Sequence, residues 1–255
     1  MNGTVERIRL YAKQLKLPSF GEYQSLARDA SESHWGYEEF LVELLKTELE
    51  HRQANQKQRL IRAARFPLIK TLDCFDFANL KNIDPVVVWD LSGNEYLRRR
   101  ENIIFIGNPG TGKSHLSIAL GLCACQAGFR VRFFSAPALA TELVEAQENH
   151  TLTKIVKQLL KTDLLILDDL SYLSFSRHQS ELLFQIISDR IERASTIVST
   201  NLEFSRWTEF FGDAMLTAAL VDRLTHRAHL LDMNGESYRL KQRRNADLGP
   251  GDTQG

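Results

Sequence analysis

Eight residues, GNPGTGKS from Gly107 to Ser114, have the types and the spacing of a phosphate-binding loop, G-x-x-x-x-G-K-[ST]. Glycines permit positive φ angles and a close approach of the backbone, so that successive N–H groups can surround a phosphate. Lys113 would bring its ammonium to the β- and γ-phosphates where a helix begins, and the Ser114 hydroxyl suits Mg²⁺. The sequence therefore predicts a site for ATP and Mg²⁺. Its candidate nucleotide-binding residues are Gly107, Asn108, Pro109, Gly110, Thr111, Gly112, Lys113, Ser114 and His115.

Two carboxylates follow the apolar run 164–167 (LLIL) further along the chain. An apolar strand that ends in acidic residues places charge at the carboxyl edge of a parallel sheet, where ligands bind. We expect Asp168 to hold Mg²⁺, usually through water, and Asp169 to orient or deprotonate an attacking water. A strand often ends in Asp at a turn, so the hypothesis depends on the phosphate loop upstream.

Asn201 and Arg223 are two further candidates that the residues alone leave open. Asn201 follows the apolar run 196–199 and could either cap a turn or respond to the γ-phosphate. Arg223 lies in a helical stretch and could either form a surface ion pair or neutralise transition-state charge. Arginine can serve that second role from a neighbouring subunit.

Short apolar runs alternate with amphipathic helical stretches over the second part of the chain. The predicted strands are 103–106, 131–134, 164–167, 196–199 and 229–231, and the predicted helices are about 113–127, 137–148, 152–161, 177–193 and 214–224. Strands that are apolar on both faces and are separated by helices favour a mostly parallel sheet between two helical layers. The sequence therefore predicts an α/β domain with a five-stranded sheet, over residues 68–247.

Residues 1–67 read as a small helical domain, 68–100 as a connecting segment and 248–255 as a disordered tail. Ser31 and Ser33 are predicted to cap a long helix that Pro67 terminates. The helix is acidic over 38–50 and basic over 51–70, which fits a solvated helix or one that contacts nucleic acid or a partner.

The composition excludes several classes of protein. Among 255 residues, 32 Lys and Arg balance 32 Asp and Glu, so bulk charge does not drive nucleic-acid binding and only local or repeated patches could. No run is long enough for a membrane span or typical of a signal peptide, which indicates a cytoplasmic protein. Three cysteines give no disulfide framework, and Cys123 and Cys125 are expected to be small buried hydrophobes.

The phosphate loop, the acidic pair, Asn201 and Arg223, in this order, resemble the AAA+ ATPases. The resemblance is closest to the branch that contains the helicase loader DnaC and the transposition helper IstB, and it covers about residues 37–244. The segments FLVELLKTELEH (40–51), GNPGTGKSHL (107–116) and LVDRLTHR (220–227) look more like IstB than DnaC. A terminal G-x-S-Y-R at 235–239 is common to the branch.

This resemblance implies a role for each candidate. Asn201 would be the first sensor and Arg223 the arginine finger, completing a catalytic set with Lys113 and Asp169. Most AAA+ proteins have Asp-Glu where this chain has Asp-Asp, and the shorter side chain predicts slow hydrolysis. The resemblance also implies that DNA stimulates this hydrolysis. No room remains for a full helical lid domain, so Arg239 is a weak substitute for a second sensor.

Relatives in this branch form rings or spirals around DNA, lined by an insertion that here contains Lys154, Lys157 and Lys161. These lysines are spaced i, i+3, i+7 and share one helix face, which suits either solvent or DNA phosphates. Contacts of this kind predict salt-sensitive, largely sequence-independent binding to double-stranded DNA. Weaker candidates are Arg98, Arg99, Arg100, Lys241, Arg243 and Arg244.

The leading hypothesis is an IstB-like ATPase that forms a homo-oligomer on target DNA and recruits the transposase of its insertion sequence. It would act in the bacterial cytoplasm, associated with the nucleoid when on DNA, and without a membrane partner. The principal alternative is a DnaC-type loader of a replicative helicase. A small-molecule kinase and an ATP-switched DNA scaffold with negligible turnover also remain open.

Overall fold

The computed structural model describes residues 2–79, 82–170, 174–235 and 237–238. Contacts between Cα atoms divide the chain into two compact units, Met1–Arg59 and Leu60–Gly255.

The first unit is helical. It contains α1 (Asn2–Gln14), the 3-10 helix η1 (Pro18–Glu22), α2 (Tyr23–Glu32) and the first part of α3 (Tyr37–Ala64). The predicted capping by Ser31 and Ser33 is wrong, because both residues belong to the end of α2 and the Ser33 N–H donates to the Asp29 carbonyl. The N-terminus of α3 is closed instead by Glu39, whose carboxylate accepts the Gly36 N–H at 3.0 Å.

A buried carboxylate ties η1 to α3. Glu48 accepts the Ser19 N–H at 3.0 Å and Arg52 Nε at 2.7 Å, while the Ser19 hydroxyl and His51 Nδ1 lie 2.9 Å apart. Burial alone would raise the pKa of Glu48, but the hydrogen bonds from Arg52 and Ser19 together outweigh burial and lower it. The acidic half of α3 is therefore partly structural, not wholly solvated.

The second unit is an α/β domain around a five-stranded sheet. The strands are β1 (Asn102–Ile106), β2 (Val131–Ser135), β3 (Leu164–Asp168), β4 (Ser195–Thr200) and β5 (Ala228–Asp232). They lie in the order β2-β3-β4-β1-β5, and all four pairings are parallel over the part of the chain described. All five predicted strands are confirmed.

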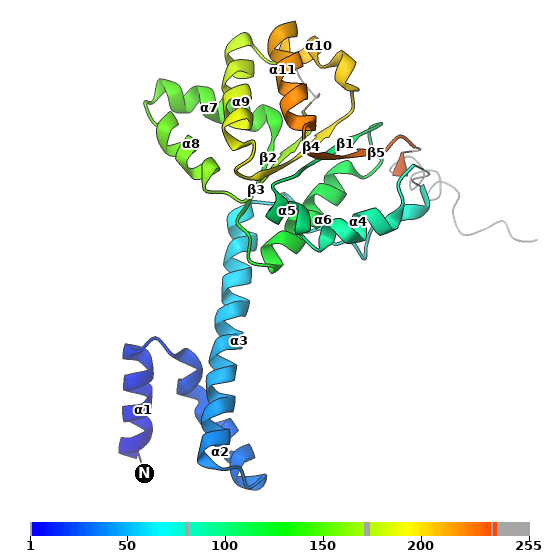
Figure 1. The fold of residues 1–255 in the computed structure, drawn as a ribbon. Coiled ribbons are helices and arrows are strands. Elements are labelled where there is room, and N and C mark those ends of the chain that lie inside the picture. Colours follow the sequence, from blue (N-terminus) through cyan, green and yellow to red (C-terminus); the bar gives the residue numbers. More distant parts are fainter. Residues whose placement is uncertain (1, 80–81, 171–173, 236, 239–255) are drawn as a thin grey trace, which may run out of the picture. The chain divides into compact units, whose positions relative to one another are not determined.

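Helices cover both faces of this sheet (Figure 1). One face carries α4 (Pro85–Ser92), α5 (Glu95–Arg99) and α6 (Lys113–Gln126). The other carries α7 (Ala136–Glu148), α8 (Leu152–Leu160), α9 (Arg177–Arg190), α10 (Thr208–Phe211) and α11 (Ala214–Thr225). The five helices predicted after residue 112 are present, and the predicted fold class is confirmed.

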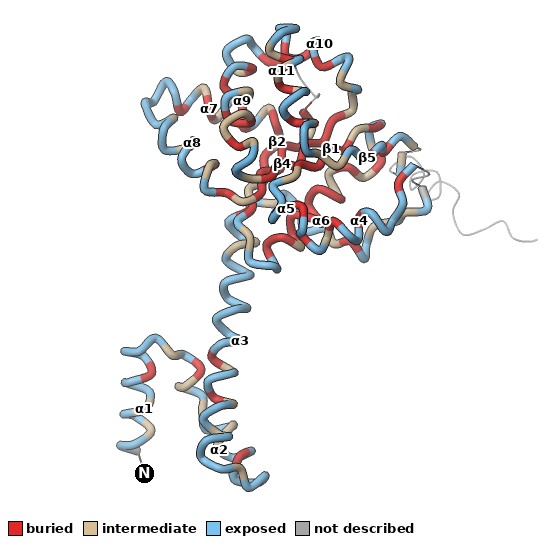
Figure 2. The backbone as a smooth tube through the Cα atoms, in the orientation of Figure 1, coloured by how far each residue is buried: buried red, intermediate tan, exposed pale blue. Residues whose placement is uncertain are grey.

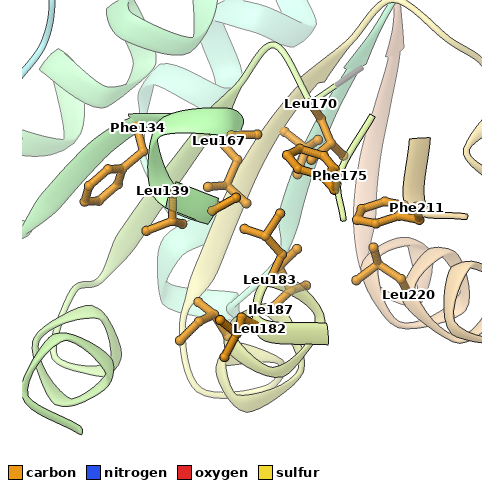
Figure 3. Packing of buried hydrophobic residues seen from close by; sticks show 14 of the residues in the cluster. Phe134, Leu139, Leu167, Leu170, Phe175, Leu182, Leu183, Ile187, Phe211 and Leu220 are labelled. Atoms are coloured by element: carbon orange, nitrogen blue, oxygen red, sulfur yellow. The ribbon is translucent and has the colours of Figure 1, made fainter. Parts of the chain in front are cut away.

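Alternate residues of each central strand enter different cores. Ile103 and Phe105 of β1 pack with α6, whereas Ile104 between them packs on the opposite side with the α7–α9 layer. The three central strands are almost wholly buried, and Figure 2 shows the buried residues of this unit concentrated at the sheet. Figure 3 shows the second core, where Leu167 of β3 lies among side chains of α7 and α9. Burial on both faces explains the continuous apolar runs in the sequence.

Residues 68–100 are more ordered than a connecting segment. They contain η2 (Phe77–Asn79), α4 and α5, which were not predicted. Asp84 caps α4 by accepting the Val86 N–H at 2.9 Å, and Pro85 fits its first turn because no N–H is needed there. Helices of eight and five residues are too short to give a clear helical period, which explains the error.

Several predictions fall outside the described residues, namely those on Arg239, Lys241, Arg243, Arg244 and the tail 248–255. Within the described part, no helix is long and apolar enough to cross a membrane. Cys125 is buried as expected, and burial raises the pKa of its thiol to about 12, while Cys123 is only half-buried.

Candidate nucleotide-binding site

The predicted phosphate loop joins β1 to α6 at the carboxyl edge of the sheet. The Gly107 N–H donates to the Thr200 carbonyl at 3.2 Å, which fixes the start of the loop to β4. Gly112, with φ of 99°, caps α6 in the left-handed region, and a Cβ there would lie 2.5 Å from the Phe75 ring. Both the backbone conformation and the close approach of Phe75 therefore require glycine at this position.

Lys113 begins α6 and is 5% exposed. Its Nζ donates to the Gly107 carbonyl at 2.6 Å and to the Asn108 carbonyl at 2.8 Å, so the ammonium lies within the loop itself. The Thr111 hydroxyl donates to the same Asn108 carbonyl at 2.9 Å. The loop thus combines a held positive charge with the N-terminus of a 14-residue helix, two features that attract phosphate.

The acidic pair lies at the end of β3, beside β4. Asp168 is the last residue of β3 and is buried, and Asp169 is half-buried with a left-handed φ of 55°. The Ser199 hydroxyl donates to Asp168 Oδ1 and accepts the Asp169 N–H at 3.0 Å. Sequence reasoning missed Ser199, and the available signal was its place near the end of the strand that Asn201 follows.

The residues present fit Mg²⁺. No cluster of three His, Cys, Asp or Glu side chains able to hold a metal occurs in the described residues. Mg²⁺ does not need one, because it usually takes one or two carboxylates and completes its shell with phosphate oxygens and water. Asp168 supplies a held carboxylate, and Ser114, half-buried in the first turn of α6, supplies a hydroxyl.

Asn201 and Arg223 occupy different surroundings. Asn201 directly follows β4, which lies between β3 and β1, so it emerges at the same sheet edge as the acidic pair and the phosphate loop. Arg223 lies on the exposed side of α11, and its guanidinium carbon lies 5.2 Å from the centre of the Phe184 ring on α9. Arg223 is therefore presented at the protein surface.

Two segments that sequence reasoning did not assign to the site also contact the phosphate loop. His115 Nε2 donates to the Thr71 carbonyl at 2.8 Å, and the His115 ring meets Phe75 edge-on at 5.1 Å. After β5, the Tyr238 N–H donates to the Gly110 carbonyl at 3.1 Å. The segment before α4 thus orients His115, and the chain after β5 contacts the loop at Gly110.

The three candidate DNA-binding lysines are exposed, on α8 and at its C-terminal end. Lys154 and Lys157 lie within the helix, and Lys161 follows its last residue. The opposite side of α8 packs into the second core through Ile155 and Leu159. The spacing therefore does place the lysines together on the solvent side.

A pocket of about 490 Å³ lies elsewhere, where β1 and β5 begin. It is lined by Arg99, Glu101, Arg227, Ala228 and His229, and Glu101 pairs with His229 at 2.9 Å. It is thus at the opposite edge of the sheet from the phosphate loop.

The parallel sheet, the loop after β1 and the acidic pair after β3 define a P-loop domain of the AAA+ type. The sequence model of the IstB-like ATP binding protein family matches residues 10–246, and the chain belongs to this family.

Two relatives are similar in sequence to this chain over most of its length. The ATP-binding protein of insertion sequence IS5376 from Geobacillus stearothermophilus is 37% identical, with 94% of this chain and 96% of that protein covered. The ATP-binding protein of insertion sequence IS21 from Pseudomonas aeruginosa is 40% identical over 88% of this chain and 85% of that protein.

Solved structures agree in fold. The DnaC helicase loader is 26% identical, with a TM-score of 0.52 over 61% of this chain and 96% of that chain. AMPPCP-bound DnaA from Aquifex aeolicus has a TM-score of 0.57 over 74% of this chain and 57% of that chain, and at 22% identity it supports the fold alone.

Proposed function

We propose that this protein is an ATP-dependent DNA-binding ATPase that oligomerises on target DNA and recruits a transposase during insertion-sequence transposition. The observation that carries the proposal is a phosphate loop and an acidic pair at one sheet edge, in a chain whose relatives are ATP-binding proteins of insertion sequences. The protein would act in the bacterial cytoplasm, and helical residues 1–67 would contact the partner or DNA, ahead of an ATPase domain over 68–247.

The side chains support a direct hydrolytic mechanism. Lys113 and the loop N–H groups bind the β- and γ-phosphates, while Ser114 and Asp168 hold Mg²⁺, which neutralises phosphate charge when bound. A water attacks the γ-phosphorus, the bond to the oxygen that bridges the β- and γ-phosphorus breaks, and the attacking water passes a proton to Asp169. Asn201, which follows β4 at the same sheet edge, would respond to loss of the γ-phosphate through its amide. The products are ADP and phosphate.

Asp169 sets the expected rate. Its side chain is one methylene shorter than the glutamate usual at this place, so the carboxylate reaches less far toward the water. We therefore expect slow turnover that duplex DNA stimulates by ordering the assembly.

Arg223 is proposed to act on the nucleotide of a neighbouring subunit. An exposed guanidinium on α11 can cross a subunit boundary, and an arginine supplied in this way stabilises transition-state charge. ATP hydrolysis would then depend on assembly and would disassemble or remodel the complex.

Mixing two inactive variants tests this role. Arg223→Ala subunits keep the phosphate loop, and Lys113→Ala subunits keep the arginine, so mixed assemblies should regain part of the ATPase rate that neither variant shows alone. Native mass spectrometry is the control that measures whether mixed assemblies form. If they form and no ratio restores phosphate release, Arg223 does not act between subunits.

DNA binding is proposed to use Lys154, Lys157 and Lys161 against backbone phosphates. A single subunit has zero formal net charge and would make only three such contacts, so it should bind DNA weakly. An oligomer assembled with ATP would multiply these contacts. Affinity for duplex DNA should therefore require ATP and fall steeply with salt.

One experiment tests the function and the helicase-loader alternative together. That alternative is supported by the likeness to the DnaC helicase loader. The protein is loaded with ATP on duplex DNA and offered a transposase encoded beside it and a replicative helicase from the same cell. We expect ATP-dependent DNA assembly that captures the transposase, weakened when the three lysines are changed to Gln. Capture of the helicase alone would overturn the transposition role.

A further inference from the structure

We propose that Ser199 is a positioning residue that sets the geometry of both acidic residues of the site. This inference deepens the proposed ATPase function and rests on it. It follows from a contact between neighbouring strands, not from a sequence motif.

Ser199 lies at the centre of the sheet. It belongs to β4, which pairs with β3 on one side and with β1 on the other, and its side chain is fully buried. It makes hydrogen bonds to three consecutive residues, the last residue of β3 and the two that follow it. Its hydroxyl contacts the Asp168 carboxylate and the Asp169 N–H, and its carbonyl accepts the Leu170 N–H at 2.9 Å.

The direction of these bonds is determined by chemistry. A hydroxyl has one proton to donate and two lone pairs that accept. An ionised carboxylate only accepts, and a backbone N–H only donates. The Ser199 proton therefore points to Asp168 Oδ1, and a lone pair receives the Asp169 N–H. Holding Oδ1 fixes the rotation of the Asp168 carboxylate, so its second oxygen has one defined direction toward a bound cation.

The hydrogen bond from the Asp169 N–H to Ser199 also supports an unusual backbone conformation at Asp169. Its φ of 55° lies in the left-handed region, which Asp adopts more readily than most residues but still rarely. The bonds to the Asp169 and Leu170 amides hold this turn. Since the turn determines where the Asp169 carboxylate points, Ser199 couples the metal-holding and water-activating residues through one side chain.

Ser195 provides a matched control. It lies four residues earlier on the same strand, so its side chain faces the same side, and it is also fully buried. Its hydroxyl donates to the Tyr96 carbonyl at 3.4 Å, near the other end of the strand. Ser195→Ala therefore measures the loss of a buried serine hydroxyl without disturbing residues 168–170.

The test compares Ser199→Ala, Ser195→Ala and the conservative variant Ser199→Thr in the full chain. In nucleotide-free protein, hydrogen exchange at the Asp169 and Leu170 amides should become about tenfold faster in Ser199→Ala. Affinity for a fluorescent ATP analogue in EDTA should stay within about threefold of the unmodified protein. Mg²⁺ is expected to strengthen binding of the ATP analogue. The Mg²⁺ concentration that gives half of this effect should rise about tenfold in Ser199→Ala, as expected when one hydrogen bond to a charged group is lost.

Ser195→Ala should leave exchange at residues 169–170 and the Mg²⁺ requirement unchanged, and Ser199→Thr should restore both because it keeps the hydroxyl. If the added methyl of Ser199→Thr lowers the melting temperature, Ser199→Cys, with its weaker donor, should fall between serine and alanine. Ser199→Ala behaving like Ser195→Ala would overturn the proposal, as would faster exchange with an unchanged Mg²⁺ requirement. An unmodified protein that binds Mg²⁺ and ATP without turnover would refute the hydrolysis proposal alone, because the exchange and Mg²⁺ measurements do not need catalysis.

Discussion

Lys113→Ala should reduce ATP affinity by at least about 100-fold and abolish ATP-dependent assembly on DNA. The physical reason is twofold. The ammonium makes charge-assisted contacts to phosphate, each worth about 1.5–3 kcal/mol, where about 1.4 kcal/mol corresponds to a tenfold change in affinity. The same ammonium also holds the Gly107 and Asn108 carbonyls, so its loss loosens the loop.

Equilibrium titration with a fluorescent ATP analogue measures this effect, and sedimentation on duplex DNA measures assembly. Lys46→Ala is a suitable control because Lys46 is exposed on α3 and pairs only with Glu43 among the ion pairs described. Assembly of Lys113→Ala that still responds to ATP would show that the loop is not the nucleotide switch.

Asp169→Asn should bind ATP with affinity within about threefold of the unmodified protein and lower the ATPase rate roughly 100-fold, as expected for loss of a general base. Asparagine accepts the left-handed conformation as readily as aspartate does, so the turn at φ of 55° is kept while the charge is removed. Without hydrolysis the ATP-bound assembly persists, and the complex with DNA should dissociate more slowly.

Phosphate release under single-turnover conditions separates this chemical effect from binding. Asp169→Glu is the matched variant that keeps the charge and lengthens the side chain by one methylene. It should turn over at least as fast as the unmodified protein if reach limits the rate. Ordinary turnover in Asp169→Asn would remove Asp169 from the role of base.

Local patterns explain why much of this protein could be predicted. The phosphate loop is one continuous segment whose function resides in backbone N–H groups and a helix N-terminus, so its residue types are visible in eight consecutive positions. The three central strands, β1, β3 and β4, are buried on both faces and appear as apolar runs for that reason. The edge strands β2 and β5 are only partly buried. These features depend on neighbours in sequence.

The sequence by itself thus determined the phosphate-loop motif, the acidic pair and the α/β alternation. Tertiary structure alone decided which side chains meet, because the order β2-β3-β4-β1-β5 is not the order along the chain. Ser199 reaches Asp168 across 31 residues and Thr71 reaches His115 across 44, and no hydrophobic period encodes such pairings. The Ser19–Glu48 contact is likewise not encoded by any local pattern, and it buries the side chain of one acidic residue of α3.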